Sequence, residues 1–123
     1  MKGTKLQGMT EDQLVDFFIA LALAQDKALL RNEYAKFNRL FDEMEAVEQE
    51  LKGRLGDQRH ALLRLYEHPN AQVRLKAVKA TLAVAPVAGR RMLKIIAESR
   101  EYPQAGEAGM SILNLDRGIF KPT

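Results

Sequence analysis

The side chains that most often carry chemistry are few in this chain and stand apart in the sequence. There are two histidines, His60 and His68, two serines, Ser99 and Ser111, and no cysteine. A metal site needs several converging ligands, such as two histidines one helical turn apart, whereas these two are separated by eight positions. Neither serine has the glycine frame of a nucleophile elbow. We therefore predict no catalytic residue, metal or cofactor, although an enzyme whose site assembles only in space stays an alternative.

Acidic side chains recur at one-turn spacing in the middle of the chain. Asp42, Glu45 and Glu48 could in principle hold a divalent cation, but no histidine accompanies them and Lys52 and Arg54 follow closely. A solvated acidic helix face is therefore the favoured interpretation, and such a face suits a basic partner.

Basic side chains form two groups that could bind a charged partner. We expect the second helices of a helical array to line its inner surface, which would place three of these side chains in one basic strip. The strip consists of Arg39, Lys76 and Lys79, and the second cluster consists of Arg90, Arg91 and Lys94. Such groups can hold phosphates. However, the net charge of +3 is a small surplus of 19 basic over 16 acidic residues, so nucleic-acid binding is the second hypothesis and protein binding the first.

The composition is that of an ordinary globular chain. Its 123 residues are 46% hydrophobic and 28% charged, which fits one domain. The lack of cysteine fits a reducing compartment, and we expect a cytoplasmic protein. The longest apolar run, residues 14–24, contains Asp16 and is too short to span a bilayer. We predict a flexible tail over residues 1–9 and a single helical domain over residues 10–123.

Two long helices are predicted first, over residues 10–55. Thr10 can cap the first helix, with Gln13 bonding back, and this helix continues to about Leu30. A short break follows, and the second helix continues to about Leu55. Its apolar positions approach a heptad seam, which predicts an antiparallel hairpin with the first helix. The seam consists of Tyr34, Phe37, Leu40, Phe41, Met44, Val47, Leu51 and Leu55.

Two shorter helix pairs are predicted next, over residues 57–85 and 86–115. In the first pair, helix 58–67 is followed by a turn at His68 and Pro69, and Asn70 can cap the next helix. Pro86 ends that helix and can begin another. In the second pair, helices 87–99 and 104–115 flank a turn. A tail over residues 116–123 follows, and its Ile119 and Phe120 are expected to fold back onto the last pair.

The two short pairs align at an offset of 31 residues. Leu62, Leu65, Ala77 and Leu82 match Leu93, Ile96, Ala108 and Leu113, and turn positions fall in register. Such similarity is typical of stacked repeats. The first pair resembles a HEAT-type repeat, whose pattern it follows through Leu62, Leu65, His68, Pro69, Asn70, Val73, Arg74, Ala77 and Leu82. The resemblance implies that Arg74 braces the turn and the neighbouring unit. In the second pair Gln104 and Ala105 replace the valine and arginine.

Beyond the repeat, residues 9–123 resemble a small bacterial family classed as a domain of unknown function. The similar segments are MTEDQLVDFF, FNRLFDEM, HPNAQVRLKAVKATLAVAP and LDRGIFKPT. This resemblance implies an all-α fold, an α-α superhelix of about three antiparallel helix pairs, and carries no activity. We predict a non-enzymatic protein-interaction module, of the adaptor or immunity type, whose partner the sequence does not identify.

Overall fold

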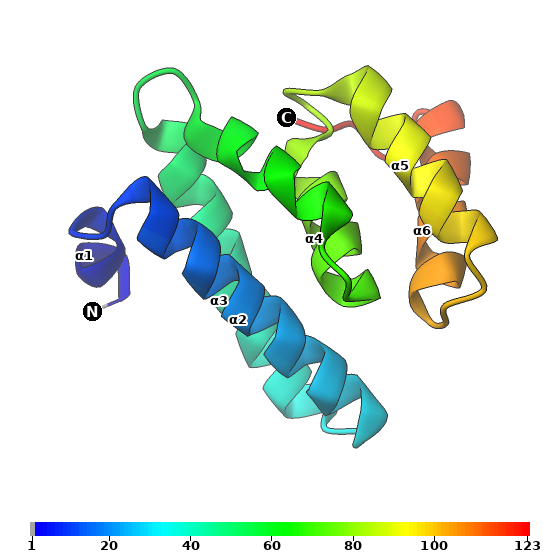
Figure 1. Cartoon of the computed structure of the whole chain (residues 1–123), viewed down its shortest axis with the longest axis horizontal. Helices are drawn as coiled ribbons and strands as arrows, with labels where there is room; N and C mark the ends of the chain where they lie inside the picture. Colours follow the sequence, from blue (N-terminus) through cyan, green and yellow to red (C-terminus); the bar gives the residue numbers. More distant parts are fainter. Residues whose placement is uncertain (1) are drawn as a thin grey trace. The chain divides into compact units, whose positions relative to one another are not determined.

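The chain folds into helices joined by short turns. The computed structural model describes residues 2–123, and this part of the chain contains six α-helices, one 3₁₀ helix and no strand, which confirms the predicted all-α class (Figure 1). Two compact units are present, Met1–Ala61 and Leu62–Thr123. The elements in order are α1 Lys2–Gln7, α2 Glu11–Leu30, α3 Tyr34–Gly53, η1 Gln58–Glu67, α4 Ala71–Thr81, α5 Pro86–Glu98 and α6 Gln104–Asp116.

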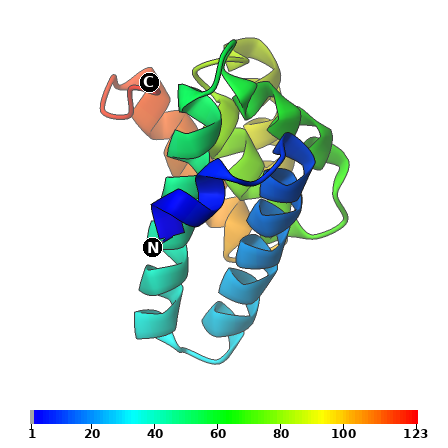
Figure 2. The same ribbon diagram turned by 90° about the vertical axis from the view of Figure 1, so that its left-hand side faces the viewer.

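The first unit is built on the antiparallel pair α2 and α3, which run side by side and are joined by a tight turn (Figure 2). Thr10 begins α2 with a complete capping box: its hydroxyl accepts from the N–H of Gln13, and its own N–H donates to the Gln13 side chain. Asn32 turns the chain with a φ of 56°. Glu33 occupies the capping position of α3, and its side chain makes no capping hydrogen bond.

Residues 2–7 form a helix where a flexible tail was predicted. Helix α1 packs against α3, and its Leu6 is buried. Arg54, just beyond α3, donates from Nη2 to the carbonyl oxygens of Leu6 and Met9 at 3.0 and 2.7 Å, and it pairs with Glu50 at 2.8 Å. The polar sequence MKGTKLQG concealed this helix because its anchoring contacts come from a segment about 48 residues away.

The apolar seam predicted for α3 is only partly buried. Met44, Val47 and Leu51 are buried, whereas Tyr34 and Phe41 are exposed. Leu55 is 98% exposed because α3 ends at Gly53 and leaves it in the following turn.

The second unit has a continuous apolar core that α4, α5 and α6 share. Asn70 caps α4 by accepting from the N–H groups of Gln72 and Val73, and α4 packs against both following helices. Residues 58–67 form a 3₁₀ helix where an ordinary helix was expected. Its Tyr66 contacts the core and hydrogen-bonds Thr81 at 2.5 Å. The core consists of Leu75, Val78, Leu82, Leu93, Ile96 and Ala108.

Gly89 sets how closely α5 can approach α4. A Cβ atom at this position would lie 2.7 Å from Cδ2 of the buried Leu82. A side chain at this position would therefore require the Leu82 side chain or the helix to shift.

The C-terminal tail folds back in part. Phe120 packs against the core, as predicted, but Ile119 is exposed. Gly118 makes the turn between α6 and the tail in the left-handed region, with a φ of 70°.

Candidate partner-binding surface

The two lysines predicted for the inner basic strip are paired within the protein. Lys76 is only 8% exposed, although it carries a charge. Its Nζ lies 3.7 Å from a carboxylate oxygen of Glu107 on α6, and the Nζ of Lys79 lies 3.0 Å from the same oxygen. Lys79 also stands 5.9 Å from the centroid of the Phe120 ring, within cation–π range. The predicted strip must therefore be revised, since Glu107 already neutralises much of its charge.

The state of Glu107 reflects these two lysines. Burial by itself would raise the pKa of its carboxyl group. The attraction of Lys76 and Lys79, together with their hydrogen bonds, outweighs burial and lowers the pKa below its usual range. The carboxylate is thus held charged between its two cationic neighbours.

Arg39, the third residue of the predicted strip, is exposed on α3 in the first unit. The two lysines belong to the second unit, so a role for Arg39 stays a separate prediction.

The second predicted cluster is on the exposed face of α5. Arg90 is held by Asp116 of α6 through two nitrogen–oxygen contacts of 2.8 and 3.1 Å. Arg91 and Lys94 are exposed, and within residues 2–123 no ion pair or hydrogen bond is found for either side chain. The cluster therefore contains one tethered cation and two whose charge faces solvent.

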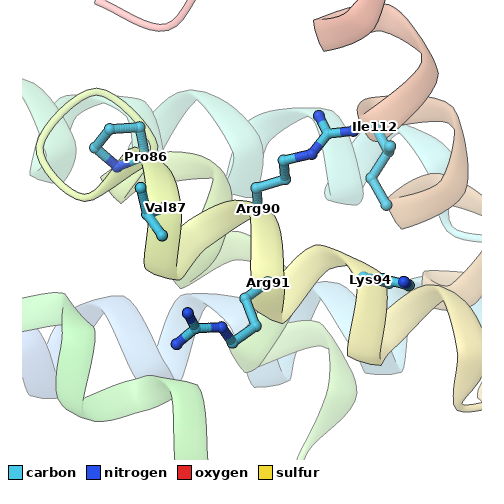
Figure 3. Close-up of a pocket in the computed structure, with 6 residues that line it drawn as sticks. All are labelled: Pro86, Val87, Arg90, Arg91, Lys94 and Ile112. Atoms are coloured by element: carbon cyan, nitrogen blue, oxygen red, sulfur yellow. The ribbon is translucent and has the colours of Figure 1, made fainter.

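These three cations line a surface pocket of about 740 Å³. Its apolar lining comes from the first turn of α5, where Pro86 and Val87 lie, and from Ile112 of α6. Figure 3 shows Arg90 extending toward Ile112, while Arg91 leaves α5 on the opposite side. Because Val87 is 72% exposed, the pocket is an open depression on the helix surface.

A second depression of about 370 Å³ adjoins the first. It shares Pro86 and Arg90 with the larger pocket and continues over Leu115 to Pro122 of the C-terminal tail. The larger depression, lined by Pro86, Val87, Arg90, Arg91, Lys94 and Ile112, is called the α5 groove.

Arg74 joins the turn before α4 to the turn after α5. Its Nη1 donates to the carbonyl oxygens of His68 and Pro69 at 3.0 and 3.1 Å, and its Nη2 pairs with Glu101 at 2.6 Å. This is a positioning contact, since the guanidinium group is taken up by protein acceptors.

The two histidines and Ser99 take part in local backbone contacts. Nδ1 of His68 accepts from the N–H of Asn70 at 3.0 Å, and Nδ1 of His60 lies 3.0 Å from the Asp57 carbonyl oxygen. Ser99 bonds to the carbonyl oxygen of Ile96. Among residues 2–123, no group of three or more histidine, cysteine or acidic side chains is arranged to hold a metal ion. Nor is any helix in that range long and apolar enough to cross a membrane.

With the geometry described, comparison with known proteins places the chain. The model of the family described as "Domain of unknown function (DUF2019)" matches residues 12–116. The chain belongs to the DUF2019 family. It is also similar to the protein RPA1889 from Rhodopseudomonas palustris CGA009, whose crystal structure superposes with a TM-score of 0.93 at 53% sequence identity. That similarity covers 96% of this chain and 98% of the other. No curated protein in the comparison matches.

Membership in DUF2019 brings no activity, so the surface itself must suggest one. The cations of the α5 groove were predicted from the sequence, but its apolar half, Val87 and Ile112, was not. One signal was available: Val87, Arg91 and Lys94 recur at intervals of four and three, which places them on one helix face.

Proposed function

We propose that this DUF2019 protein is a non-enzymatic protein-interaction module built from HEAT-like helix pairs. The observation that carries the proposal is the open groove on α5, where apolar and unpaired cationic side chains face solvent together. Exposed apolar groups beside charged ones are typical of protein-binding surfaces. Helical arrays generally bind partners through such extended faces.

The turns of the two short helix pairs support the repeat. At the matched positions 68 and 99, the side chains of His68 and Ser99 each accept from the N–H two residues later. At the matched positions 70 and 101, the carbonyl oxygens each accept from the N–H four residues later, at 3.1 and 2.7 Å. Three of the four matched apolar pairs are buried on both sides, the exception being Leu113.

Polar side chains of the two short helix pairs also meet in space. Lys76 and Glu107, 31 residues apart, form the ion pair between α4 and α6. Gln72 and Gln104, offset by 32, join their side chains by a buried hydrogen bond of 2.9 Å. Such contacts are those expected where one repeat stacks on the next in an α-α superhelix.

Site-specific photo-cross-linking in living cells tests the function. A photoreactive amino acid is placed in turn at four exposed apolar positions: Phe41, Val87, Ile95 and Met110. We expect a covalent adduct with another protein at one or more of them. If none of the four gives a protein adduct under conditions in which the chain is folded, the proposed function is wrong.

Nucleic-acid binding is the second candidate, favoured by the exposed Arg91 and Lys94 one turn apart. Binding that neutralises several phosphates weakens steeply between about 50 and 200 mM salt. A fluorescence anisotropy titration with duplex and single-stranded DNA at low salt decides this case. No change in anisotropy eliminates the candidate.

A further inference from the structure

The α5 groove combines two features that point to one kind of partner. Its apolar residues, Pro86, Val87 and Ile112, gain by leaving water. Arg91 and Lys94 beside them gain by meeting negative charge. Building on the proposed function, we propose that this groove binds an acidic amphipathic helix of a partner protein.

Four neighbouring cations of the second unit are paired within the protein, unlike Arg91 and Lys94. Arg74 is paired with Glu101, Lys76 and Lys79 with Glu107, and Arg90 with Asp116. These pairs are internal to the second unit. Arg91 and Lys94 are exposed without such a partner within residues 2–123, so the groove has positive charge to offer.

The spacing along α5 argues for a helical partner. Val87 precedes Arg91 by four residues and Lys94 by seven, so at about 1.5 Å per residue they are about 6 and 10.5 Å further along the helix. A partner helix that places an apolar anchor at Val87 presents residues at the same intervals on one face. Same-face residues of an extended strand recur about every 6.6 Å, which suits Arg91 but matches Lys94 less well, so a helix fits the two cations better.

The apolar lining argues against nucleic acid as the occupant. A phosphate backbone would engage Arg91 and Lys94 but would leave Val87 and Ile112 in water. An apolar side chain entering the depression beside Pro86 buries them. Arg90 is already paired with Asp116 on the surface, so Arg91 and Lys94 are the cations of the groove that a partner would meet.

Selection from a displayed library of helical peptides, randomised along one face, tests the proposal on the whole chain. We expect the enriched peptides to carry an apolar residue with Asp or Glu four and seven positions away. Val87→Asp should weaken their binding about tenfold or more, and so should the double reversal R91E with K94E. Enriched peptides without acidic residues, or peptides that still bind both variants, would overturn the proposal.

The matched control is K27E with R31E at the end of α2. Lys27 and Arg31 are also exposed and about one turn apart, so this variant makes the same change of charge at nearly the same spacing. It should leave peptide binding unchanged within about twofold. Equal loss in both double variants would mean that net charge alone drives binding, and the groove assignment would fail.

Two further measurements separate other occupants. In sedimentation velocity the unliganded chain should stay monomeric. If it self-associates and the double variant R91E with K94E abolishes this, the groove binds a second copy of the chain. Tight, salt-sensitive binding of duplex DNA that the same variant abolishes would assign the groove to nucleic acid. Cross-links from Phe41 or Met110 alone would leave the interaction function standing while eliminating this groove as its site.

Discussion

A pair of cations one turn apart lies on each of helices α4 and α5, and the two pairs have opposite surroundings. Lys76 and Lys79 on α4 converge on Glu107, and Lys76 is almost fully buried. Arg91 and Lys94 on α5 face solvent next to an apolar depression. The first pair holds α4 to α6, whereas the second leaves its charge available. The difference shows that a basic pattern on a helix acquires a role only through what the fold places opposite it.

Reversing the charge of a buried lysine is expected to give the largest effect. In K76E a carboxylate would occupy the buried position of Lys76 beside Glu107, whose side chain is 41% exposed, so two negative charges would lie close together. We expect the free energy of unfolding to fall by about 3 kcal/mol or more. Urea denaturation monitored by circular dichroism measures this. The matched variant R91E should change it by less than about 0.5 kcal/mol; similar losses in both would remove the contrast between the helices.

The next largest effect should come from acid, which should weaken the contacts of Lys76 and Lys79 with Glu107. The pKa of Glu107 is lowered in the folded protein from an ordinary value of 4.5, so below that value the unfolded chain binds protons more readily. The stability from this group is complete above pH 4.5 and is lost as the pH falls through the folded pKa. Comparing the urea denaturation midpoints of the wild type and E107Q from pH 6 to pH 3 measures the stability that the Glu107 carboxylate contributes. The gap between them should narrow with acid, and a constant gap would contradict the assignment.

Replacing one glycine on α5 and one on α6 with alanine compares a packed helix face with an open one. In Gly89→Ala the new Cβ would meet Leu82, and we expect a net loss of about 1 kcal/mol after the gain in helix propensity. Nothing lies within 4 Å of a Cβ at Gly106, so Gly106→Ala should stabilise the protein by about 0.5–1 kcal/mol. Thermal unfolding gives both values. A stabilising Gly89→Ala would show that Leu82 yields easily.

Local features of this fold could be predicted, and features set by distant partners could not. The Thr10 capping box and the Asn70 cap depend on residues three positions away or fewer, which the sequence displays directly. The pairing of Lys76 depends on Glu107, 31 residues later, and its side chain looked like any solvated lysine. Similarly, the exposure of Phe41 and the pocket wall at Ile112 follow from which helix faces are left uncovered, and helical periodicity does not specify that.

The smallest effect on stability should come from the α5 cations, and there the contrast is sharpest. Replacing both in R91A with K94A removes two charges that no described residue satisfies, so the free energy of unfolding should stay within about 0.5 kcal/mol of wild type. Cross-links from position 87, if they form, should nevertheless weaken strongly in this variant. A stability loss above about 1 kcal/mol would mean that Arg91 or Lys94 braces the fold as Lys76 does. Unchanged stability together with lost cross-links would instead separate binding from folding on two adjacent helices.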